Sequence, residues 1–174
     1  MHTRATCLAA ISLLLLSALT ASSQQKRGPS TPEERSKAVQ FAHDLEANPL
    51  GPQATNEREW LTRWLIEIPD ITVEVCPRLL GPKLPDKKKF GTEIFSQLLY
   101  SEAAFVIENP DKSSDPLAVH IAGVTGSLKV YEAVLKDHPK DRLEALDAII
   151  VRRDKQELKD HVQESLKYCT KRVS

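Results

Sequence analysis

The sequence predicts an all-α fold, a compact bundle of six or seven helices in a single domain with one disulfide. Apolar residues recur at spacings of three and four along most of the chain, which is the period of a helix face. Several segments open with a capping residue followed by proline or glutamate, as helix starts do. Only residues 71–76 alternate like a β-strand, and no second strand signal offers them a partner.

Residues 1–23 are expected to be a cleaved signal peptide for export. Arg4 supplies an early positive charge, and an apolar run covers residues 8–19. Small side chains at Ala21 and Ser23 favour cleavage after Ser23, and cleavage after Ser22 is nearly as favourable. Polar residues then end the run before it reaches the ~20 apolar residues that a membrane span needs. We therefore expect an exported protein, periplasmic or extracellular, without a membrane span.

The mature chain is expected to comprise a disordered lead, residues 24–30, and one helical domain, residues 31–174. The full sequence carries 24 basic and 24 acidic residues, and the signal contains a single basic residue, so the mature domain is nearly neutral. Near-neutral charge gives no support for a nucleic-acid partner. Two cysteines remain after cleavage, Cys76 and Cys169, and in an oxidising compartment they are expected to form one disulfide.

The first two helices of the domain are predicted from their ends. Thr31 and Glu34 form a capping box around Pro32, and Asn48-Pro49 ends this helix. A second helix is predicted over Glu57–Ile66 with Asn56 as its cap.

Residues 71–76 allow two interpretations. Their alternation of β-branched residues fits a strand. Helical spacing also works, because Ile71, Val75 and Leu79 share a face and Asp70 could cap the helix. We expect a short helix that is disturbed at Pro77.

The next two helices are expected to form the centre of the bundle. One begins at Thr92, carries apolar residues on nearly all sides and ends at Asn109-Pro110. The other begins at Asp115-Pro116, where a cap precedes a proline. Gly123 and Gly126 lie inside this helix, where glycine costs about 1 kcal/mol relative to alanine, so they indicate either close packing or a break.

The helix that begins at Asp115 also carries an apolar seam at alternating spacings of four and three, which predicts either helix packing within the domain or a surface for a partner. The residues of this seam are Leu117, Ile121, Val124, Leu128, Tyr131 and Leu135.

Two further helices are predicted after His138-Pro139. The first carries the apolar residues of Leu143–Ile150. Asp154 with Glu157 resembles a capping box and predicts the start of the last helix, which ends at Cys169. A disulfide from Cys76 would therefore fasten the last helix to the middle of the domain.

The sequence contains no recognised catalytic, cofactor or metal motif. Gly-x-Ser-x-Gly is absent, and no two histidines stand four residues apart. We therefore expect no cofactor and no metal, and a non-catalytic domain that binds an unknown protein partner or has a structural role, with an inhibitor or immunity protein as a specific subclass.

Two alternatives remain open. The first is a hydrolase with a site assembled from dispersed residues such as His120, His138 and Asp141. The second is a carrier of a small apolar ligand, which would need an enclosed cavity beside Trp60, Trp64 and Phe95.

Overall fold

The computed structural model describes residues 27–83 and 87–169, and within these ranges the chain is helical and contains no strand. The expected signal peptide, residues 1–23, lies outside the described residues. The α-helices are α1 (Pro32–Ala47), α2 (Ala54–Glu67), α3 (Gly91–Glu108), α4 (Pro116–Asp137), α5 (Glu144–Asp154) and α6 (Leu158–Cys169). Two short 3-10 turns, η1 (Pro77–Leu80) and η2 (Lys87–Lys89), lie between α2 and α3. The predicted all-α fold is confirmed.

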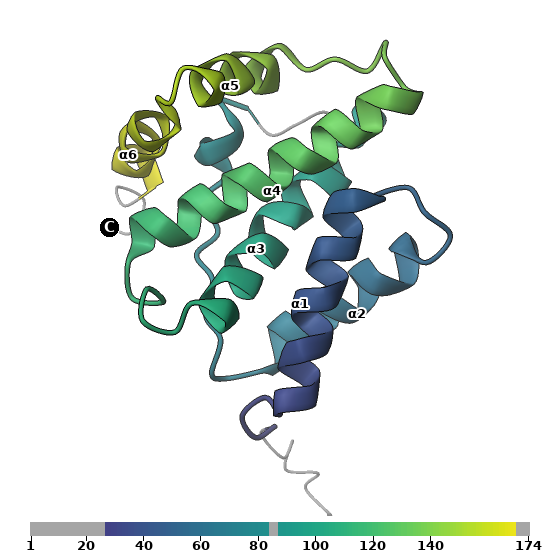
Figure 1. Ribbon diagram of the computed structural model, residues 1–174, viewed down its shortest axis with the longest axis vertical. Helices are drawn as coiled ribbons and strands as arrows, with labels where there is room; N and C mark the ends of the chain where they lie inside the picture. The colour runs from purple at the N-terminus through teal and green to yellow at the C-terminus, as the bar shows by residue number, and fades with distance from the viewer. Residues whose placement is uncertain (1–26, 84–86, 170–174) are drawn as a thin grey trace, which may run out of the picture.

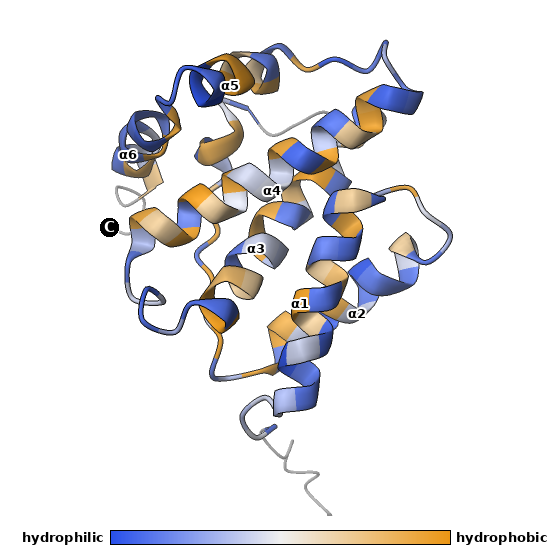
Figure 2. Cartoon of the chain, in the orientation of Figure 1, coloured by the Kyte–Doolittle hydropathy of each residue, from blue (hydrophilic) through white to orange (hydrophobic). Residues whose placement is uncertain are grey.

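The long helices α3 and α4 form the centre of the molecule and pack against each other more extensively than any other pair of elements in the described chain. The pair α1 and α2 lies on one side of this centre, and α5 and α6 lie at the opposite end (Figure 1). Hydrophobic turns face inward between the helices, whereas α5 and α6 present mainly hydrophilic residues to the outside (Figure 2). Burial of one stripe per helix accounts for this arrangement.

The buried side chains form two clusters, one on each side of α3. The larger cluster joins η1, α3, α4, α5 and α6, and the smaller cluster joins α1, α2 and α3. Helix α3 is thus covered on both sides, as its nearly continuous apolar sequence predicts. Leu98 and Leu128 lie in the larger cluster, and Leu45, Leu61 and Trp64 lie in the smaller one.

Helix α4 is unbroken, and its two glycines lie where α3 approaches closely. A Cβ added to Gly123 would lie 2.8 Å from the carbonyl oxygen of Leu98, and one added to Gly126 would lie 2.6 Å from the Cβ of Ser101. Both distances are too short for van der Waals contact. Of the two explanations that the sequence allows for these glycines, close packing therefore holds.

The substitution Gly126→Ala is expected to lower the free energy of unfolding by about 1–3 kcal/mol, the usual cost of overpacking a core. The added methyl group must push Ser101, and with it α3, away from α4. Chemical denaturation measures the effect, with Gly28→Ala as a control because nothing lies within 4 Å of a Cβ at that position. A gain of about 1 kcal/mol from helix propensity alone would contradict the close packing.

The predicted capping residues of α1 and α4 are confirmed. The Thr31 hydroxyl accepts a hydrogen bond from the Glu34 amide at 3.2 Å, and the Glu34 carboxylate accepts one from the Thr31 amide at 3.0 Å. At α4, the Asp115 carboxylate accepts bonds from the amides of Leu117 and Ala118. These side chains satisfy amides that the first turn of a helix leaves unpaired.

The part of the lead that the structure describes contacts the helices. Ser30 is buried and donates hydrogen bonds from its amide and its hydroxyl to Asp70, both at 2.8 Å. Arg27 forms ion pairs with Glu34 and Glu67. Residues 27–30 thus join the start of α1 to the end of α2.

The predicted start of α2, at Glu57 with Asn56 as the cap, is wrong. The helix begins at Ala54 and follows Gln53, and the Asn56 side chain donates to the Gln53 side chain at 3.3 Å. The cause is the turn after α1, in which the Ala54 amide already bonds to the Gly51 carbonyl at 3.1 Å. The chain is therefore winding before Asn56, and buried Ala54 packs in the smaller cluster.

The expected short helix over residues 71–76 is wrong as well, and the segment has no regular secondary structure. Asp70 does not cap a helix, because its carboxylate accepts hydrogen bonds from Ser30 and Arg35. Ile71 is buried in the smaller cluster and Cys76 in the larger one. A helix advances only about 1.5 Å per residue, so an extended chain is better suited to join two separate clusters.

The predicted capping role of Asp154 at the start of the last helix is also wrong. Asp154 is the last residue of α5, and α6 begins at Leu158. Gln156 has a positive φ of 64°, the Gln156 amide bonds to the Arg153 carbonyl, and the Glu157 amide bonds to the Arg152 carbonyl. This pair of bonds is the Schellman pattern that ends a helix, so Asp154 belongs to the end of α5.

Cys76 and Cys169 are joined in a disulfide, with their Cα atoms 5.7 Å apart. This separation lies within the usual range for a disulfide. The bond fastens the end of α6 to the chain just before η1, as the sequence predicts. No helix of the described chain is long and apolar enough to cross a membrane.

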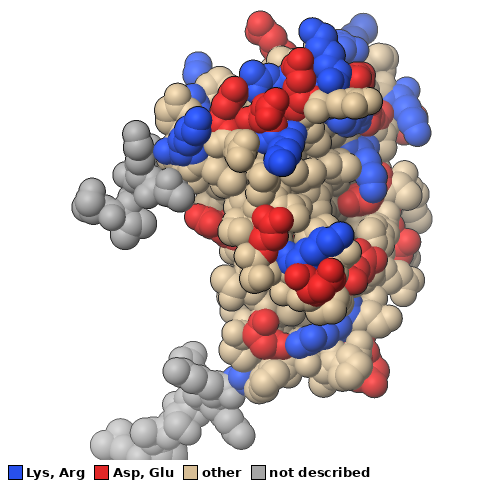
Figure 3. Space-filling view, turned by 60° about the vertical axis from the view of Figure 1, so that its left-hand side comes forward, with Lys and Arg blue, Asp and Glu red and all other residues tan. Residues whose placement is uncertain are grey.

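The surface shows no large region of one charge on the face seen in Figure 3. Charged side chains of both signs gather at its upper end, where α5 and α6 lie, and smaller mixed groups lie lower on this face, separated by uncharged surface (Figure 3). This mixture agrees with the near-neutral composition.

Candidate functional site

The apolar seam of α4 packs inside the domain. Val124, Leu128 and Tyr131 are buried in the larger cluster, and the other three residues are partly buried against it. The Tyr131 hydroxyl also donates to the Asp147 carboxylate at 2.8 Å and accepts from the Leu143 amide at 2.7 Å. The seam therefore serves the contacts of α4 with its own domain. The other three residues are Leu117, Ile121 and Leu135.

The residues considered for a dispersed hydrolase site do not come together. His138 and Asp141 lie beyond the end of α4, with 3.8 Å between the nearest nitrogen and oxygen atoms. His120 lies near the start of the same helix, about 27 Å away for eighteen residues at the helical rise. Its ring is hydrogen-bonded to Glu102 instead, at 2.7 Å. The sequence indicated His120 but gave no sign of this partner.

The residues considered for an apolar-ligand site also lie apart from one another. Trp60 and Trp64 stack with ring centroids 5.7 Å apart, and Phe41 meets Trp60 edge-on at 5.5 Å. These rings belong to the smaller cluster, whereas Phe95 packs against the larger one. The three aromatic residues named from the sequence thus do not surround one space.

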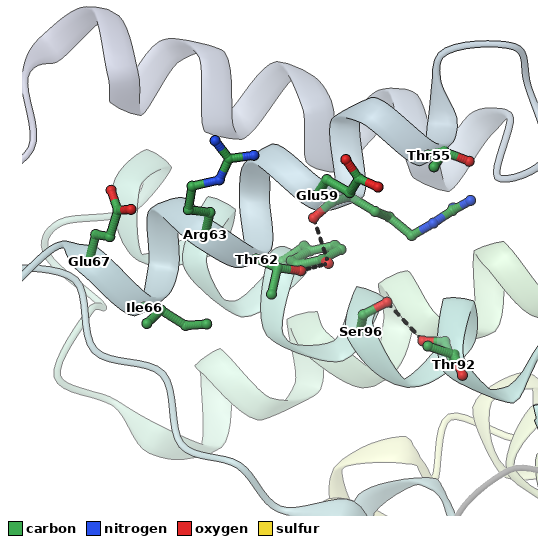
Figure 4. A pocket seen from close by; sticks show the side chains of 10 residues that line it. Thr55, Glu59, Thr62, Arg63, Ile66, Glu67, Thr92 and Ser96 are labelled. Atoms are coloured by element: carbon green, nitrogen blue, oxygen red, sulfur yellow. Dashed lines mark hydrogen bonds between the residues drawn. The ribbon is translucent and has the colours of Figure 1, made fainter.

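An open groove of about 570 Å³ lies between α2 and α3 (Figure 4). The two helices contact each other much less than α1 contacts α3, which leaves this space open. Each wall is a row of residues at helical spacing. The α2 wall includes Thr55, Glu59, Thr62 and Ile66, and the α3 wall consists of Thr92, Ser96 and Tyr100.

Several hydroxyl groups of the groove are bonded within the protein. The Tyr100 hydroxyl lies 2.6 Å from the Thr62 hydroxyl and donates to the Arg58 carbonyl at 3.1 Å. The Ser96 hydroxyl donates to the Thr92 carbonyl at 2.8 Å, along α3. These three hydroxyl groups therefore already have partners within the domain.

Ile66 is the large aliphatic residue of the groove, and 79% of its surface is exposed. Burying an isoleucine side chain stabilises a fold or a complex by about 1.5–3 kcal/mol, and Ile66, being exposed, does not supply this stabilisation to the domain itself. Arg63 and Glu67 carry their charged ends away from Ile66, on the other side of α2 (Figure 4). An apolar centre beside charged groups is the arrangement found in protein interfaces.

The sequence contains a residue that marks this groove, Ile66, but the helical periodicity of α2 does not single it out. Trp60, Leu61 and Trp64 dominate α2 and mark its inner face. Ile66 does not follow this pattern, because it lies four residues after Thr62 and seven after Glu59, on the opposite, polar side of the helix. A single isoleucine on a polar helix face is common, so its value depends on the neighbouring α3.

A second group of polar residues crosses α1, α3 and α4. The Glu46 carboxylate accepts hydrogen bonds from the Ser101 hydroxyl at 2.8 Å and from the Lys129 ammonium at 2.6 Å. On the same side, a hydrogen bond to Glu108 raises the pKa of His43. These residues line a cavity of about 450 Å³. The charges are paired with one another, so the arrangement is a structural network between helices.

Within the described ranges, no group of three histidine, cysteine, aspartate or glutamate residues is arranged to hold a metal ion. No known protein family matches the chain, and no curated protein or solved structure is significantly similar to it.

Proposed function

We propose that the chain is an exported, non-catalytic helical domain that binds a protein partner in the groove between α2 and α3. The observation that carries this proposal is the exposure of Ile66, 79%, as the aliphatic residue of a groove lined otherwise mainly by polar and charged residues. The partner we propose is an amphipathic helix that places an apolar side chain against Ile66. A helix laid in a groove is a common mode of peptide recognition.

A charged residue on the Ile66 side of α2 defines the rest of this partner. Glu59 lines the groove with Ile66, whereas the charged ends of Arg63 and Glu67 lie on the other side of α2. A complementary helix would therefore present a basic residue opposite Glu59, beside its apolar side chain. Such charge complementarity favours one register and one orientation of the partner.

The disulfide supports export. Structural disulfides persist in oxidising compartments and are rare in the cytosol. Cys76 and Cys169 are paired in the structure, and both follow the predicted signal peptide. A small, helical, disulfide-linked domain that binds a protein fits an inhibitor or immunity protein, and we propose this subclass.

The test uses purified mature protein, residues 24–174, with the substitution Ile66→Lys and the matched control Val151→Lys. Val151 is also an exposed aliphatic residue, at 51%, but it lies on α5 outside the groove. A partner is first captured from the envelope or secreted fraction and then purified. We expect Ile66→Lys to weaken its binding at least about tenfold, which is about 1.4 kcal/mol, and Val151→Lys to change it little.

Equal binding of the partner by both variants would contradict the groove as the site. Circular dichroism and thermal unfolding of the two variants check that neither substitution disturbs the fold. A small molecule bound to the purified protein, with no partner recovered, would favour the carrier alternative over the present proposal.

A further inference from the structure

His120 lies inside the molecule between two carboxylates that come from different elements. The residue is 2% exposed, and its Nδ1 atom lies 2.7 Å from Oε1 of Glu102, a fully buried residue of α3. Its Nε2 atom lies 3.8 Å from Oε2 of Glu74. Glu74 belongs to the irregular segment 69–76, and its side chain is 59% exposed.

The position between two carboxylates favours the charged form of the ring. A neutral imidazole donates from one nitrogen and presents a lone pair at the other, whereas an imidazolium donates from both. A neutral His120 that donates to Glu102 would turn its lone pair toward Glu74. Burial opposes protonation, but the hydrogen bond and charge of Glu102 outweigh it and raise the pKa of His120. Glu102 on α3 and Glu74 on the segment are the ionisable groups that face the ring.

Of the two carboxylates, Glu102 is fixed and Glu74 can move. Glu102 is enclosed by the close contact of α3 and α4, where a Cβ at Gly123 would lie 2.7 Å from its Cγ. Burial also raises the pKa of Glu102, against the hydrogen bond from His120. Glu74, in contrast, is largely exposed and lies on a segment without regular secondary structure.

The segment is held firmly at its two ends. At one end, hydrogen bonds from Ser30 and Arg35 outweigh the effect of burial and lower the pKa of Asp70 to about 2. At the other end, Cys76 is buried and joined to Cys169. Between Asp70 and Cys76, no backbone amide bonds to the backbone of another described residue. Glu74 is therefore the polar tie between the middle of the segment and α4.

We propose that protonated His120 is a latch that holds residues 72–75 against the start of α4, and that its deprotonation loosens these residues while the helices stay folded. As the pH rises, the ring loses its positive charge and Glu74 loses the group that attracts it. The two ends of the segment stay fixed, because Asp70 remains ionised and the disulfide does not titrate. The latch thus responds to pH through the charge of one histidine, as histidine switches do.

The test follows the methyl groups of Val73 and Val75 and the ring signals of His120 by nuclear magnetic resonance. The mature protein is titrated from about pH 5 to about pH 9, the range in which histidines change charge. We expect the methyl and ring signals to share one midpoint, above the ordinary histidine value. Glu74→Gln should shift the His120 midpoint to lower pH and remove the shared titration of the methyl groups.

Glu108→Gln is the matched control, because Glu108 is a partly exposed partner of a different histidine, His43. This variant should leave the midpoint of His120 and the methyl titration unchanged. The latch is overturned if His120 titrates without a change at Val73 and Val75, or if Glu74→Gln leaves the His120 midpoint where it was. Loss of signals throughout the protein over the same pH range would also overturn it, because the change would then be unfolding.

Discussion

Removal of the disulfide by the double substitution Cys76→Ala and Cys169→Ala is expected to lower the free energy of unfolding by about 4–5 kcal/mol. The two cysteines are 93 positions apart, so the bond closes a long loop and removes much of the freedom of the unfolded chain. Domains of this size are stable by only about 5–15 kcal/mol, so this loss is a large fraction of the total stability.

Chemical denaturation of the double variant and of the wild type under non-reducing conditions measures this effect. Wild-type protein treated with a reductant provides the control, because it loses the same bond without a change of sequence. The local consequence should appear at α6, which packs on η1, α4 and α5 and loses its covalent tie. A loss of less than about 1 kcal/mol would contradict the stabilising role of the bond.

The second large effect is expected at the buried pair of Glu102 and His120. Glu102→Met leaves the imidazole buried beside an apolar side chain, and His120→Leu leaves the carboxylate without its partner. Breaking a buried pair from one side costs about 3–5 kcal/mol, whereas replacing both members by apolar residues is often nearly neutral. The double variant should therefore be more stable than either single variant.

A double-mutant cycle measured by chemical denaturation tests this expectation. Additive losses in the double variant would contradict it, because they would mean that the two side chains stabilise the protein independently. Gly123 is unchanged throughout, so the space beside position 102 stays the same.

The contribution of this pair should also depend on pH. The pKa of His120 is raised in the folded protein, so folding favours the protonated ring. The stability that His120 contributes is therefore fully present below its unfolded pKa, about 6.5, and is lost as the pH rises through the folded value. The difference in the free energy of unfolding between the wild type and the double variant should decline in this way as the pH rises. A rise of this difference with pH would contradict the expectation.

Local signals in the sequence predicted the helix ends that depend on neighbouring residues. Thr31 with Glu34 and Asp115 with Pro116 were sufficient, because a capping side chain acts within one turn of its own helix. The disulfide could also be predicted from the sequence, since only two cysteines follow the predicted signal peptide.

The wrong predictions at Asn56 and Asp154 have local causes, the turn before α2 and the Schellman bonds that end α5. The wrong prediction for residues 71–76 has distant causes. Asp70 could cap a helix by sequence, but its carboxylate accepts hydrogen bonds from Ser30 and Arg35, 40 and 35 positions earlier. Ile71 and Cys76 are buried in separate clusters, which no local pattern reveals.

The candidate groove escaped prediction for a similar reason. Ile66 becomes notable only because α3 stands opposite α2 without covering it. The partner of His120 was also hidden, because Glu102 lies on another helix within an apolar stretch.

Site-specific photo-cross-linking tests the proposed binding groove most directly. A cross-linking amino acid replaces Ile66 in one variant and Val151 in a matched one, and both are exposed to the partner-containing fraction. We expect one partner to cross-link at position 66 and not at position 151. Excess wild-type domain should suppress this product, and excess Ile66→Lys domain should not. Cross-linking at both positions, at position 151 alone, or equal suppression by the two competitors would contradict binding in the groove between α2 and α3.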